Sequence, residues 1–174
     1  HLATTEQIEP LWVPYIFGGM PVFGPLLFPK DVNYIEIIFR LVAKLLFPAA
    51  NPWFVPHIFL AGLGMYLLAR HLRFSSLQAL FASVVLMLNP YFINLPTIGH
   101  GSKLAVFSLL PFVFLLTLKL FETRKLLYLG LLGAAMGWMH LLRHPQIAFY
   151  ILLTVGCYLL YDVLSDLKVK RPSA

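Results

Sequence analysis

Long apolar runs separated by short polar segments fill the chain after residue 52. Each run approaches the roughly 20 residues that a helix needs to cross a bilayer. The second run is cut short at Asn89 and Pro90, because proline removes a backbone donor, and residues 91–95 are expected to begin a loop. The pattern predicts an all-α transmembrane bundle of about five helices, over residues 53–69, 77–88, 104–118, 126–142 and 147–164.

The N-terminal segment carries a different pattern, in which prolines and glycines alternate with aromatic residues. Because these breakers disfavour regular structure, residues 1–32 are expected to form an irregular loop. Aromatic rings favour the headgroup level of a membrane. Trp12 and Tyr15 are therefore candidate site residues within this loop.

A polar stripe distinguishes residues 33–47 from the runs that follow. Glu36, Arg40 and Lys44 recur every four residues, which places them on one face of a helix, and apolar residues cover the other faces. Three charges in the middle of a helix disfavour a membrane span. The stripe predicts an amphipathic helix that lies along the membrane interface.

Composition agrees with an integral membrane protein. Hydrophobic residues make up 60% of the chain and charged residues 11%, with a mean hydropathy of +0.82. The formal net charge of +6 comes from cations in the short segments between apolar runs, which indicates membrane topology and argues against a nucleic-acid-binding face. A lone cysteine, Cys157, excludes an intrachain disulfide.

Lysine and arginine counts orient the bundle, because the segments richer in these residues face the cytoplasm. Residues 70–73, 119–125 and the tail at 165–174 hold most of the cations and are expected to be cytoplasmic. The N-terminal loop, residues 89–103 and residues 140–146 then share the outer face. Their convergence predicts a functional site there.

The middle outer segment has the composition of an anion pocket. Gly99 and Gly101 free the backbone, Ser102 is expected to cap the following helix, and Lys103 and His100 supply positive charge or hydrogen bonds. The spacing differs from that of a P-loop. A glycine-rich turn with a lysine that reaches the interface is the alternative interpretation.

Residues 140–146 interrupt the apolar pattern with four polar residues: His140, Arg143, His144 and Gln146. The preceding helix should stop near Arg143, because the residue before a proline is biased away from helical geometry. The cluster is either an interfacial anchor or part of a substrate site. No metal site is predicted, because the proline turn separates the histidines and no carboxylate lies nearby in the sequence.

Three stretches together resemble the YfhO family of bacterial membrane proteins: residues 12–21 (WVPYIFGGMP), residues 59–70 (FLAGLGMYLLAR) and residues 144–146 (HPQ). The resemblance covers residues 10–164. It implies the GT-C class of glycosyltransferases, which act in the bacterial inner membrane as multi-pass proteins. A polyprenyl-phosphate glycolipid would be the sugar donor, handled on the outer face.

The resemblance assigns no catalytic residue to this segment. Members of the family are much longer, and the GT-C carboxylate lies in a loop that would precede His1. Glu6 and Glu9 come closest to it, and Val13 stands where asparagine is more usual. We therefore expect a segment of a longer protein, or a shortened relative. If the chain is active as the resemblance implies, the candidates for holding the lipid phosphate are Lys103, Arg143 and His144, and His100 could assist.

The competing hypothesis is a non-catalytic subunit of a larger membrane complex. Small residues give the fourth helix faces suited to close packing against other helices, namely Gly130, Gly133, Ala134 and Gly137. In that case membrane lipids and other subunits are the partners, and His57 or His140 is a candidate ligand for a tetrapyrrole pigment. The third hypothesis is a lipid transporter. Internal repeats are common in that class, and this sequence shows none.

Overall fold

The computed structural model describes residues 12–13, 20–21, 34–48, 53–142 and 144–169. Within these ranges the chain is helical apart from one pair of two-residue strands, in which Trp12 pairs with Pro21 and Val13 with Met20. The elements are β1 (Trp12–Val13), β2 (Met20–Pro21), α2 (Tyr34–Leu46), α3 (Val55–His71), α4 (Ser76–Met87), α5 (Pro90–Thr97), α6 (Gly101–Phe107), α7 (Leu110–Thr123), α8 (Leu126–Leu141) and α9 (Pro145–Val169).

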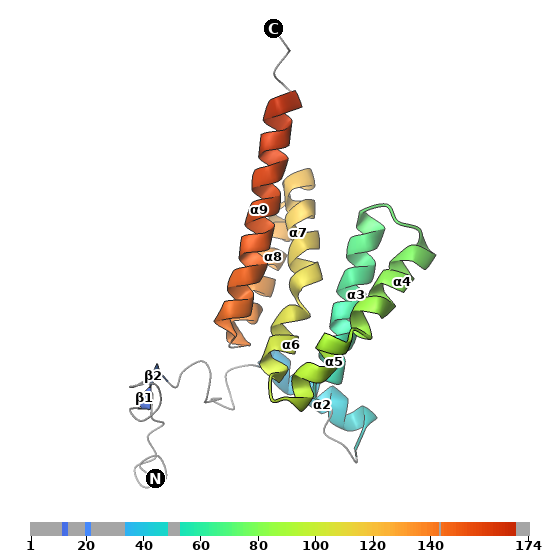
Figure 1. The fold of residues 1–174 in the computed structure, drawn as a ribbon, viewed down its shortest axis with the longest axis vertical. Helices are drawn as coiled ribbons and strands as arrows, with labels where there is room; N and C mark the ends of the chain where they lie inside the picture. The colour runs from blue at the N-terminus through green and yellow to red at the C-terminus, as the bar shows by residue number, and fades with distance from the viewer. Residues whose placement is uncertain (1–11, 14–19, 22–33, 49–52, 143, 170–174) are drawn as a thin grey trace.

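The longer helices run up and down, so the turns between them collect at two ends (Figure 1). One end holds α2, α5, the start of α6 and the junction between α8 and α9; we call it the α2 end. The other end holds the α3–α4 turn, the α7–α8 turn and the C-terminal part of α9. The predicted outer segments at 89–103 and 140–146 thus lie at the same end of the bundle.

The chain is membrane-embedded. Among the residues that the structure describes, three stretches are long and apolar enough to cross a bilayer: Ser76–Thr97, Gly101–Thr123 and Pro145–Ser165. The helix α8 is apolar but shorter, with 16 residues, and α3 has 17. All five predicted apolar runs are helical, and five crossings remain a prediction.

Helix α4 ends at Met87, as the break at Asn89 and Pro90 predicted, but the expected loop at residues 91–95 is wrong. Helix α5 begins at Pro90, where the missing N–H of proline is not needed because the first turn of a helix has no intrahelical acceptor. The Asn89 side chain accepts a hydrogen bond from the Tyr91 backbone N–H at 2.9 Å and caps the new helix. This continuation lengthens the run to the 22 residues of Ser76–Thr97.

The third apolar run is interrupted between α6 and α7. Pro111 cannot donate to the carbonyl of Phe107, so the regular ladder breaks just before it. The Ser108 hydroxyl donates instead to the carbonyl of Ala105 at 2.6 Å, which satisfies a buried polar group at the break.

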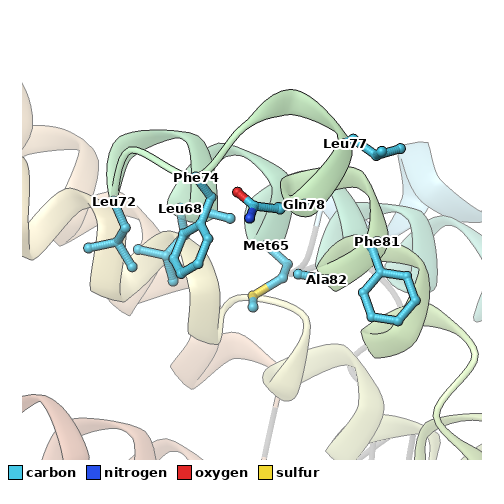
Figure 2. A pocket seen from close by; sticks show the side chains of 9 residues that line it. Met65, Leu68, Leu72, Phe74, Leu77, Gln78, Phe81 and Ala82 are labelled. Atoms are coloured by element: carbon cyan, nitrogen blue, oxygen red, sulfur yellow. The ribbon is translucent and has the colours of Figure 1, made fainter.

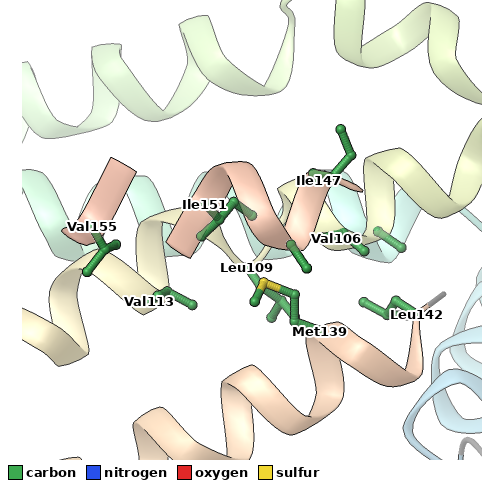
Figure 3. Packing of buried hydrophobic residues seen from close by; sticks show 10 residues of the cluster. Val106, Leu109, Val113, Met139, Leu142, Ile147, Ile151 and Val155 are labelled. Carbon is green, nitrogen blue, oxygen red and sulfur yellow. The ribbon is translucent and has the colours of Figure 1, made fainter. Parts of the chain in front are cut away.

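The core lies where α6, α7, α8 and α9 meet, and Figure 3 shows apolar side chains from these helices turned toward one another. A smaller cluster joins α3, α5 and α6 through Ala61, Phe92, Leu95 and Leu104. The main cluster comprises Ala105, Val106, Leu109, Val113, Met139, Leu142, Ile147, Ala148, Ile151 and Val155. Most of this packing holds the α2 end together, since it surrounds the start of α6 and the α8–α9 junction.

Helix α2 lies with part of its polar stripe turned into the protein. Glu36 and Ala43 are buried, while Arg40 and Lys44 are exposed. The apolar face is open, with Ile38, Leu41 and Leu45 among its exposed residues. An open apolar face on a membrane-embedded chain fits a helix that rests on lipid, as predicted for the interface.

The small residues of α8 make no close contact among the described residues, so their packing against other helices of a complex remains a prediction. A Cβ added at Gly130, Gly133 or Gly137 meets nothing within 4 Å among the described residues. Met139 supplies the buried contact of this helix, so its glycine face turns outward. Close approach occurs instead on α3, where a Cβ at Gly64 would lie 2.6 Å from the Phe112 ring and 3.2 Å from Pro111.

The segments that flank the bundle are only partly described. The strand pair of β1 and β2 lies within the expected irregular loop at 1–32, the rest of which is outside the described residues. Helix α9 continues to Val169, beyond the expected end at residue 164. Residues 170–174 of the expected cytoplasmic tail are outside the described residues.

Gly64→Ala is expected to lower the free energy of unfolding by about 1–3 kcal/mol, because the new methyl group overpacks the α3–α7 contact. Gly133→Ala is the matched control on the open face of α8. It should be neutral or stabilising by up to about 1 kcal/mol, from helix propensity alone. Unfolding by SDS in mixed micelles measures both, and equal stability of the two variants would contradict the packing.

Candidate anion site and a buried carboxylate–histidine pair

The turn before α6 brings a histidine and a lysine to the α2 end. Gly99 has φ +80°, a conformation that favours glycine, and the chain then enters α6 with His100 as N-cap. The expected capping role of Ser102 is wrong, because Ser102 lies inside the first turn and no side chain caps this helix. Lys103 follows on the same turn and is partly buried.

His144 lies opposite this turn, at the junction between α8 and α9. Helix α8 ends at Leu141, as the position before Pro145 predicted. Burial lowers the pKa of His144, and the nearby positive charge of Lys103, followed by that of His100, lowers this pKa further. Ala105 and Val106 of α6 share one buried cluster with Ile147 and Ala148 at the start of α9, so the two outer segments meet. They bring His100 and Lys103 near His144, and we call these three residues the cationic site.

Other predicted residues are engaged elsewhere or not described. His140 is exposed, and its Nδ1–H donates to the Met136 carbonyl of its own helix at 2.7 Å. The Gln146 side chain donates to the Tyr150 hydroxyl at 3.0 Å, one turn along α9. Tyr15 and Arg143 lie outside the described residues, as does the side chain of Trp12.

A second polar feature at the same end was not predicted. The Nε2 of His57, in the first turn of α3, donates to the Glu36 carboxylate of α2, with Oε2 at 3.1 Å and Oε1 at 3.3 Å. His57 is 0% exposed and Glu36 is 6% exposed. A buried carboxylate of this kind requires a partner, because desolvation disfavours its charge.

Aromatic rings from two helices and from the turn before α3 surround the Glu36–His57 pair. The His57 ring lies 5.0 Å from Phe39 of α2, 6.1 Å from Trp53 and 6.4 Å from Trp138 of α8, between ring centroids. Phe39 also meets Trp138 edge-on at 5.4 Å. The rings tie α2 to the bundle around the pair, and edge-to-face contacts of this kind are favourable.

Trp53 connects the pair to the cationic site. The Arg40 guanidinium lies over the Trp53 ring, 5.8 Å from its centroid. The far edge of the ring lies on Gly101, where any Cβ would collide with it. Gly101 is thus required by the tryptophan that covers it.

Three buried ring nitrogens have no hydrogen-bond partner among the described residues: His57 Nδ1, Trp138 Nε1 and His144 Nδ1. Buried polar atoms in native proteins are usually paired, so each nitrogen is open to a hydrogen bond with water or a ligand, in which Trp138 Nε1 can only donate. His57 already donates its other nitrogen to Glu36. Ligation of a tetrapyrrole by that nitrogen would require the pair to break.

The sequence contains one indication of the pair, which the polar-stripe interpretation does not use. Glu36 was assigned to a polar stripe, and a stripe on an amphipathic helix ordinarily faces water. In a membrane-embedded chain, an ionisable residue inside a helix often has a polar or ionisable partner. His57, at the start of an apolar run, is an ionisable residue of this kind. Glu36 and His57 are 21 positions apart, and nothing in the sequence between them indicates that the two residues meet.

An apolar cavity of about 630 Å³ lies between α3 and α4 near the opposite end (Figure 2). Gln78 is the one polar residue in its lining, and its side chain accepts from the Ser75 backbone N–H at 2.9 Å in a helix cap. No cationic-site residue lines this cavity. No group of three metal-ligating side chains occurs within the described residues.

Lys103→Gln is expected to raise the pKa of His144 toward the ordinary histidine value, because a neighbouring positive charge that opposes protonation is removed. Histidine NMR of the chain in detergent micelles measures this pKa. Lys119→Gln removes the same charge from α7, away from His144, and should leave the pKa unchanged. An unchanged pKa in Lys103→Gln would show that Lys103 is not near His144.

Comparison with protein-family models, with curated proteins and with solved structures yields no match to this chain. The function is therefore argued from the two features at the α2 end, the cationic site and the buried Glu36–His57 pair. These features are formed by segments that are distant in sequence, which come together only in the folded bundle.

Proposed function

We propose that this chain is part of a YfhO-like polytopic membrane protein that handles a polyprenyl-phosphate glycolipid, as GT-C glycosyltransferases do. The observation that supports the proposal is the packing of α6 against the start of α9, which brings His100 and Lys103 near His144 at one end of an apolar bundle. A cationic cluster beside membrane-spanning helices suits a ligand with an anionic head and a long apolar tail. Five membrane crossings, an outward-facing α2 end and a bacterial inner membrane belong to the same proposal.

The residues of the cationic site have distinct roles in this proposal. Lys103 is a permanent positive charge for the phosphate, and His100 adds a second donor. Burial and the positive charge of Lys103 lower the pKa of His144 and so favour its neutral form. A bound phosphate would favour the protonated form and raise that pKa. Affinity should therefore increase as the pH falls from the raised pKa of the complex to the lowered pKa of the free protein, and should level off below it.

A second candidate function is a non-catalytic subunit of a larger membrane complex. The open glycine face of α8 favours it, since Gly130, Gly133 and Gly137 leave room for another helix to approach closely. Stoichiometric membrane partners in a mild-detergent preparation, without binding of an isoprenoid phosphate, would support this candidate over the first.

Lys103→Gln is expected to weaken binding of farnesyl phosphate by about 10- to 100-fold, the equivalent of one charge-assisted hydrogen bond. Isothermal titration of the chain in detergent micelles measures the affinity, with farnesol as the uncharged ligand control. Lys119→Gln is the matched variant, because it removes one positive charge outside the cationic site. Equal weakening by both variants would reduce the binding to nonspecific attraction and contradict the proposal.

A further inference from the structure

We propose that the buried Glu36–His57 pair is a positioning unit: acting through Trp53, it fixes the turn that carries His100 and Lys103. Helix α2 then sets the geometry of the cationic site without touching the ligand. The consequence for ligand binding rests on the proposed function. The mechanical link itself rests on the contacts among α2, α3 and α6.

The first step is the attachment of α2 to α3. His57 Nε2 lies 3.1 Å from Glu36 Oε2, and burial of both side chains leaves little water to compete for this bond. Removal of the Glu36 carboxylate would leave His57 Nε2 buried without the acceptor that it has here. The pair therefore holds α2 at one position on the start of α3.

The second step is the capture of Trp53 by α2. Arg40, one turn after Glu36, lies over the Trp53 ring, while His57 meets the same ring edge-on. One contact comes from α2 directly and the other comes through the pair. A shift of α2 would remove the support of this ring on both sides.

The third step is the contact between Trp53 and the cationic turn. The ring lies directly on Gly101, the residue between His100 and Ser102. Backbone covered so closely cannot move toward the tryptophan, and it gains freedom when the ring leaves. The position of Lys103, two residues further, follows from the position of Gly101.

Their burial makes Glu36 and His57 positioning residues and not catalytic ones. Both are closed off from solvent, and the nitrogen of His57 that faces Glu36 is already bonded. A substrate would have to displace the surrounding rings to reach either group. Their effect on a ligand is therefore expected to pass through Trp53.

The chain contains a matched control pair at the opposite end. His71 Nε2 of α3 lies 3.2 Å from Glu122 Oε1 of α7, so the residue types and the separation match those of the buried pair. Glu122 is largely exposed, and no cationic-site residue lies at that end. Loss of this pair tests what removal of a glutamate–histidine contact does by itself.

The experiment compares Glu36→Ala, Glu36→Gln and Glu122→Ala in the whole chain in detergent micelles. The pKa of His144 is measured by histidine NMR, the affinity for farnesyl phosphate by titration, and helix content by circular dichroism. Glu36→Ala should raise the His144 pKa and weaken binding by about tenfold, because Lys103 is no longer held in place. Glu36→Gln keeps an acceptor for His57 and should stay within about threefold of the wild type. Glu122→Ala should change neither readout.

A second variant removes the link and keeps the pair. Trp53→Leu leaves Glu36 and His57 bonded and should reproduce the effects of Glu36→Ala on the His144 pKa and on binding. If Glu36→Ala loses helix content, Trp53→Leu tests the inference in its place. An unchanged His144 pKa in Trp53→Leu would overturn the inference. If the wild type binds no farnesyl phosphate, the proposed function fails, and the His144 pKa alone still supports or overturns the link.

Discussion

A buried carboxylate in an apolar bundle persists only with a partner, and this constraint organises the α2 end. Glu36 reaches His57, and in doing so it brings an amphipathic helix against the start of α3. The rings of Phe39, Trp53 and Trp138 then close around the pair. The contacts that define this end of the molecule follow from where that one charge is placed.

Much of the helical architecture could be predicted from the sequence, because membrane helices need long apolar runs and such runs are directly visible. The all-helical, membrane-embedded character is confirmed, and the number of crossings remains a prediction. Local rules explain the differences: Pro90 begins α5 where a stop was expected, and Pro111 divides a run that looked continuous. Composition shows that a segment is apolar, but the start of each helix depends on individual donors and caps.

The candidate site was predictable only in part, for a different physical reason. The meeting of the 89–103 segment with the 140–146 segment followed from counting crossings, and the structure places His144 near Lys103 and His100. The partner of Glu36 could not be predicted, because no local rule links α2 to a histidine 21 residues away. Small residues show where a helix can approach but not whether one does, and the glycine face of α8 has no close neighbour among the described residues.

In the proposed function, the α2 end holds the phosphate of an isoprenoid lipid. The most direct measurement is photo-crosslinking of native membranes with an isoprenoid phosphate that carries a diazirine next to its phosphate, followed by mass spectrometry of the labelled peptides. We expect labelled peptides from the start of α6 and from the α8–α9 junction, and competing farnesyl phosphate should reduce the labelling of both. Labels concentrated at the α3–α4 turn, or spread evenly along the helices, would contradict it.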